Sequence, residues 1–173
     1  MRHGVRLGID VGKARIGVAR CDPHGLLATP LETVPRARGT DRGDLRRILE
    51  LVGEHAAFEA VVGLPFGLSG HRTPSTEDAE LFAQRLLTAA RAEAGSGRAA
   101  LEVRLVDERL STVSAQQGLR DAGRSTKKSR NVIDQAAAVV ILQHALDLER
   151  GRGVPPGTVI GADEAEDRRR GTA

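Results

Sequence analysis

Hydrophobic residues form short runs at the start of the chain and longer helical repeats further on. The opening VRLGIDVG predicts a short buried strand that ends at Asp10. A second apolar run at residues 16–21 follows a tight turn, and turn residues separate it from a third run at 26–34. Connections this short allow only antiparallel pairing. The first 34 residues therefore predict three antiparallel strands.

Helical and strand-like patterns alternate after these strands. Asp41 can cap a helix whose apolar residues recur every three or four positions, and Ser75 with Asp78 can cap another that extends to about Ala94. The other predicted elements are strands at 60–64 and 101–106, helices at 112–122 and 132–150, a Gly- and Pro-marked loop at 65–74 and a basic loop at 123–131.

These elements predict an α/β fold with a mixed five-stranded sheet: three antiparallel strands and then two parallel strands. Strands separated by helices are usually parallel and carry helices on both faces. A chain of 173 residues suits one domain, which we expect to span residues 1–150. The segment 151–173 is rich in Gly, Pro and mixed charge, and predicts a disordered tail.

Composition excludes several classes of protein. A hydrophobic fraction of 40% supports a buried core, and no apolar run approaches the roughly 18 residues of a membrane span. The first residues lack the apolar stretch of a signal peptide, so we expect a cytoplasmic protein with no membrane partner. Cys21 is the only cysteine, which excludes an intrachain disulfide and predicts a buried strand residue.

Basic residues gather in two groups, although the net charge is only +3. Such groups suit phosphate contact, but a solvated helix face explains the first group equally well. With three Phe and no Trp or Tyr, the chain offers few platforms for stacking bases, so recognition should rest on charge and shape. The first group comprises Arg36, Arg38, Arg42, Arg46 and Arg47, and the second, which we favour as a nucleic-acid contact, comprises Arg124, Lys127, Lys128 and Arg130.

Three carboxylates stand at the ends of predicted elements: Asp10, Glu108 and Asp134. If these elements converge, the acids form an all-oxygen site suited to two Mg²⁺ or Mn²⁺ ions, the arrangement that phosphodiester hydrolysis uses. Lys13 follows Asp10 closely and could bind a backbone phosphate. Asp107 is an alternative to Glu108, because adjacent strand residues point to opposite faces. We predict that Glu108 faces the metals.

Each acid also has a purely structural explanation. Asp10 could begin a turn, and Asp134 could complement a helix N-terminus. Glu108 could form an ion pair with Arg104 or Arg109.

Four ordered motifs, LGIDVGKARIGVA, VVGLPFGLSG, VDERLST and IDQAAAVVIL, resemble the YqgF family, also called RuvX, of Holliday-junction resolvases and pre-16S rRNA processing nucleases. The resemblance implies a ribonuclease-H-like fold, metal-binding acids at Asp10, Glu108 and Asp134, and a loop at 63–70 that lines the site. It predicts a metal-dependent endonuclease that cuts structured nucleic acid. The substrate would be an rRNA precursor, which we slightly favour, or a four-way DNA junction, whose paired cuts require a homodimer.

Two other classes of function compete with a nuclease. An ATP-binding, actin-like fold opens with a similar strand and turn, but it needs a second lobe and a second phosphate loop, and neither is apparent here. A non-catalytic nucleic-acid-binding module would use the basic residues without the acids.

Overall fold

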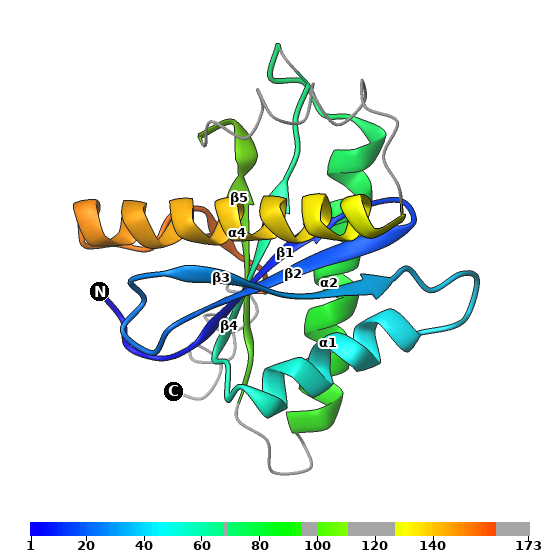
Figure 1. Cartoon of the computed structure of the whole chain (residues 1–173), viewed down its shortest axis with the longest axis horizontal. Coiled ribbons are helices and arrows are strands. Elements are labelled where there is room, and N and C mark those ends of the chain that lie inside the picture. Colours follow the sequence, from blue (N-terminus) through cyan, green and yellow to red (C-terminus); the bar gives the residue numbers. More distant parts are fainter. Residues whose placement is uncertain (68, 95–99, 111–126, 162–173) are drawn as a thin grey trace, which may run out of the picture.

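A computed structural model of the chain describes residues 1–67, 69–94, 100–110 and 127–161, with backbone alone at 110 and 127–134. A six-stranded mixed sheet forms its centre, in the order β3-β2-β1-β4-β5-β6 (Figure 1). The strands are β1 (Arg6–Val11), β2 (Arg15–Cys21), β3 (Ala28–Pro35), β4 (Glu59–Leu64), β5 (Glu102–Asp107) and β6 (Thr158–Val159). The helices are α1 (Gly43–Glu54), α2 (Pro74–Ala94), α4 (Lys127–Arg152) and the short 3₁₀ helix η1 (Glu108–Leu110).

Strand pairing confirms the predicted arrangement of the first five strands. β1 pairs antiparallel with β2, and β2 pairs antiparallel with β3. β4 is parallel to both β1 and β5, so the carboxyl ends of these three strands meet at one edge of the sheet. Cys21 is buried at the end of β2, as predicted.

The prediction of five strands was wrong, because β6 adds a sixth. β6 lies within the segment predicted as a tail and pairs antiparallel with the outer edge of β5. The Arg104 side chain donates a hydrogen bond to the carbonyl of Pro156, and the Ile160 N–H donates to the carbonyl of Val103. Backbone pairing of this kind needs no particular side chains, so the composition of the segment did not reveal it.

Helices cover both faces of the sheet (Figure 1). Leu7 and Ile9 of β1 point towards α1 and α2 and join the larger core cluster. The alternate residues face α4, where Leu142 and Ala138 pack directly over Gly8. A side chain at Gly8 would overlap α4, so α4 lies close against the sheet. None of the described helices is long and apolar enough to cross a membrane.

Two helices begin at other residues than expected. The α2 N-terminus is capped by Thr73, whose hydroxyl accepts from the Thr76 N–H, and Pro74 takes the first helical position. Asp78 instead pairs with Arg36. α4 begins at Lys127, so the predicted basic loop is partly helical. The helix predicted at 112–122 lies outside the described residues.

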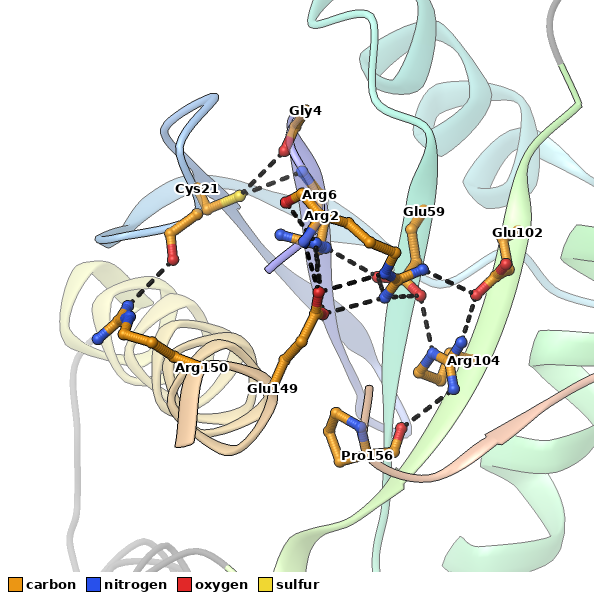
Figure 2. A network of polar contacts seen from close by, with 11 residues as sticks. Arg2, Gly4, Arg6, Cys21, Glu59, Glu102, Arg104, Glu149, Arg150 and Pro156 are labelled. Carbon is orange, nitrogen blue, oxygen red and sulfur yellow. Dashed lines mark hydrogen bonds and ion pairs between the residues drawn. The ribbon is translucent and has the colours of Figure 1, made fainter. Parts of the chain in front are cut away.

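A network of arginines and glutamates joins the amino ends of the strands, away from the carboxyl ends (Figure 2). Glu59 of β4 accepts hydrogen bonds from Arg2, Arg6 and Arg104, at 2.7 to 3.0 Å. Glu149 near the end of α4 also bonds to Arg2 and Arg6. The network therefore ties the amino-terminal segment, three strands and α4 together.

Candidate active site

Two of the predicted acids lie at the edge where the parallel strands end. Asp10 is the next-to-last residue of β1 and is 8% exposed, and Glu108 directly follows β5 and is 5% exposed. Both are on the α4 side of the sheet: Asp10 follows Gly8 by two residues, and the Glu108 carboxylate lies over Gly63 together with Ile141 of α4. The fold thus brings two nearly buried carboxylates to one edge and one face.

Gly63 makes space for Glu108. A β-carbon at this position of β4 would overlap both Glu108 Oε1 and Ile141 Cδ1. The absence of a side chain lets the carboxylate lie directly against the strand between β1 and β5. Gly63 falls in the predicted strand at 60–64 and also in the loop at 63–70 that the family resemblance implies; in the structure it is a residue of β4 beneath one of the acids.

Asp107 has a different partner. Arg109 donates to it from Nε at 3.1 Å, from Nη2 at 2.6 Å and from its backbone N–H at 2.9 Å. The hydrogen bonds and charge of Arg109 hold the pKa of Asp107 below its ordinary value. The other arginine considered for Glu108, Arg104, bonds to Glu59 and Glu102. Both arginines are thus engaged with other carboxylates.

The backbone at Asp134 lies at the same edge of the sheet. Gln135 donates a hydrogen bond to Thr33, and Thr33, Gly17 and Asp10 are aligned across β3, β2 and β1. Position 134 is therefore level with Asp10 along the sheet. The Asp134 side chain lies outside the described part of the chain, and no cluster of three metal-binding side chains occurs among those that are described.

The loop after β4 borders this edge. Its Ser69 hydroxyl is 2.7 Å from His71 Nδ1, and the Gly67 N–H donates to the carbonyl of His71. The Arg109 guanidinium lies over the Phe66 ring, 4.6 Å from its centroid. The sequence alone gives no sign that Arg109 belongs to this edge, because Arg109 and Phe66 are distant in the sequence.

Comparison with known proteins identifies the family. The family model RuvX, described as Holliday junction resolvase, matches residues 4–148. The chain belongs to the RuvX family.

Relatives of this RuvX chain carry a nuclease name. A protein of Clavibacter sepedonicus named "Putative pre-16S rRNA nuclease" is 59% identical over 161 residues, 92% of this chain and 93% of the relative. A protein of Streptomyces coelicolor with the same name is 53% identical over 158 residues, 91% and 88% of the two chains. The solved structure of T. thermophilus RuvC in complex with Holliday junction substrate is similar in fold, with a TM-score of 0.51 at 19% identity, covering 90% of this chain and 100% of that chain.

Some of the basic residues of this RuvX chain form ion pairs with carboxylates, and Lys13 is exposed to solvent. Lys13 is exposed in the hairpin turn after Asp10. Phosphate contact was considered for the whole first group, but Arg36 pairs with Asp78 and Arg47 pairs with three glutamates, so these two have structural partners. In the second group, Arg124 and the side chains of Lys127, Lys128 and Arg130 lie outside the described residues.

Proposed function

We propose that this RuvX-family chain is a divalent-metal-dependent endonuclease of ribonuclease-H-like fold, which hydrolyses phosphodiester bonds in structured nucleic acid. The observation that carries the proposal is that Asp10 and Glu108 are both buried and lie at the same edge of the sheet. Two carboxylates that are at least nine-tenths buried, on one face of one sheet edge, are costly unless a cation or hydrogen bonds compensate them. Buried acids that meet at the end of a parallel sheet are typical of active sites.

The residues at this edge fit Mg²⁺ or Mn²⁺. Asp10 and Glu108 offer only oxygen donors, which these hard cations prefer, and the bare backbone at Gly63 lets the Glu108 carboxylate lie directly against β4. We propose Asp134 as the third ligand, because its backbone is level with Asp10. Two divalent ions held by such acids supply the activation of water and the stabilisation of the leaving oxygen.

The other side chains at this edge bind and orient the strand. The exposed ammonium of Lys13, three residues after Asp10, can bind a backbone phosphate next to the acids. In the second basic group, Arg124, Lys127, Lys128 and Arg130 remain proposed phosphate contacts near the start of α4.

Two substrates are consistent with this chemistry. Relatives are named for pre-16S rRNA, which favours an rRNA precursor as the cellular substrate. The family description and the RuvC fold favour a four-way DNA junction instead. Paired cuts in a junction need two active sites, so this second candidate requires a two-fold homodimer.

Substitution of the acids tests the chemistry. Asp10→Asn, Glu108→Gln and Asp134→Asn should each lower the cleavage rate with Mg²⁺ by about 100-fold or more, while nucleic-acid affinity changes far less. Asp147→Asn is the control, because this exposed carboxylate is near the other end of α4. Parental cleavage rates in Asp10→Asn and Glu108→Gln would contradict the proposal.

A side-by-side assay separates the substrates. The parent protein with Mg²⁺ or Mn²⁺ is given a mobile four-way DNA junction and a precursor 5′ segment of 16S rRNA, while its mass in solution is measured. A single cut in the RNA by a monomer supports rRNA processing. Symmetric paired nicks by a dimer support junction resolution and overturn our preference.

A further inference from the structure

A groove of about 460 Å³ lies between α1 and α2, on the opposite face of the sheet from α4. Arg42, immediately before α1, and Arg85 of α2 line it from the two sides, and Leu81 and Phe82 contribute apolar wall. Among the described residues, neither Arg42 nor Arg85 has an ion-pair partner, and both side chains are exposed. The groove thus offers two free guanidinium groups.

The acids that line the groove are already engaged. Asp44 accepts hydrogen bonds from the N–H groups of Ala37 and Leu45, and Asp41 accepts from the Gly43 N–H. Each of these carboxylates serves the first turn of α1 or the segment before it. They offset part of the positive charge but leave the two guanidinium groups without a counter-ion.

Arg36 connects the groove to the proposed active site. Its guanidinium makes two hydrogen bonds of 2.9 Å to Asp78 of α2 and one of 3.1 Å to the carbonyl of Gly12, in the turn that follows Asp10. It also lies over the Phe82 ring, 5.3 Å from the centroid. The groove therefore begins beside the hairpin turn that carries Lys13. Arg36 lines it there, held in place by its bonds to Asp78 and Gly12.

We propose that the groove is a second phosphate-binding site, which holds the sugar–phosphate backbone of the nucleic acid at a distance from the scissile bond. This inference rests on the proposed nuclease function. Arg42 and Arg85 bind phosphodiester oxygens, and guanidinium groups are suited to this role because they donate two parallel hydrogen bonds. A strand that leaves the acids at the sheet edge passes Lys13 and then enters the groove.

The ligand is the backbone rather than a base. Phe82, the aromatic residue in the groove wall, is 3% exposed and is covered by Arg36, so no ring face is open for stacking. The site should consequently accept RNA and DNA of any sequence.

Binding measured in EDTA, where metal-dependent cleavage is absent, tests the groove. Arg42→Gln and Arg85→Gln should each weaken binding to a long probe of about 25 nucleotides several-fold. The slope of log K against log salt should decrease by about 0.7 per arginine on single strands, or about 0.9 on duplex. A short probe of about 5 nucleotides that occupies only the site near Asp10 should show no change.

Arg20→Gln is the matched control, because Arg20 is also an exposed arginine without an ion-pair partner among the described residues, but it pairs with Leu7 towards the amino end of β1. Unchanged salt slopes in Arg42→Gln and Arg85→Gln would contradict the proposed phosphate-binding role of the groove. The proposal would also fail if these variants lost no more affinity than Arg20→Gln, or lost equal affinity for the long and the short probe. A parent protein that binds but does not cleave would refute the nuclease proposal alone, whereas a parent that binds no probe would refute both.

Discussion

At the scale of single residues, Gly63 has no space for a side chain at the proposed active site. Gly63→Ala would force its new β-carbon into the Glu108 carboxylate and Ile141. We expect the free energy of unfolding to decrease by about 1 to 3 kcal/mol, and the cleavage rate to decrease as Glu108 moves. Urea denaturation and a cleavage assay measure the two effects.

Gly151→Ala provides the comparison for Gly63. A β-carbon on Gly151 of α4 meets nothing within 4 Å, so this variant should gain up to about 1 kcal/mol of helix stability and cleave at the parental rate. Equal behaviour of the two variants would show that Gly63 does not hold space for Glu108.

At the scale of elements, Glu59 connects β1, β4 and β5 through three arginines. Glu59→Gln would leave Arg6 and Arg104, both buried, without their shared carboxylate. We expect a loss of about 3 to 5 kcal/mol in the free energy of unfolding, measured by urea denaturation. Glu50→Gln, which removes an exposed partner of Arg47, should cost at most about 1 kcal/mol. A similar loss in both variants would contradict a special role for the network.

The same network should make stability depend on pH through Glu149. Burial raises the pKa of Glu149, but hydrogen bonds from Arg2 and the charges of Arg6 and Arg2 outweigh it and hold the pKa below its ordinary value of 4.5. The contribution of a carboxyl with a lowered folded pKa is complete above its unfolded pKa and is lost as the pH falls through the folded pKa. The stability difference between the parent and Glu149→Gln should therefore be constant near neutral pH and shrink below about pH 4.5. A difference that grows on acidification would refute this explanation.

At the scale of the whole molecule, the segment 153–161 closes one edge of the sheet through β6. A chain that ends after Arg152 should be less stable than one that ends after Gly161, because it loses the β5–β6 pairing and the bond from Arg104 to Pro156. At about 1 kcal/mol for each of a few hydrogen bonds, the midpoint of thermal unfolding should decrease by several degrees. The shorter chain should also aggregate more readily, since the edge of β5 becomes open. Identical unfolding of the two chains would contradict the role of β6.

Features that depend on neighbours in the sequence were predictable. Periods of two and of 3.6 residues indicated the five main strands and the helices, and they placed Asp10 and Glu108 at the ends of buried strands. The four motifs indicated the RuvX family without any structure. These signals depend on residues that are close together in the chain, so a single sequence is enough to detect them.

Features that depend on contacts between distant segments were decided only by the tertiary structure. The sequence grouped five arginines together, yet packing gives Arg36 and Arg47 carboxylate partners and leaves Arg42 beside a groove. The predicted strand at 60–64 contains Gly63, but the sequence did not indicate that the Glu108 carboxylate lies directly over this residue. β6 was not predictable either, because backbone hydrogen bonds to a sheet edge place little demand on side-chain type. Charge pairing, close approach and edge pairing all depend on which segments meet in space, and a linear pattern does not encode that directly.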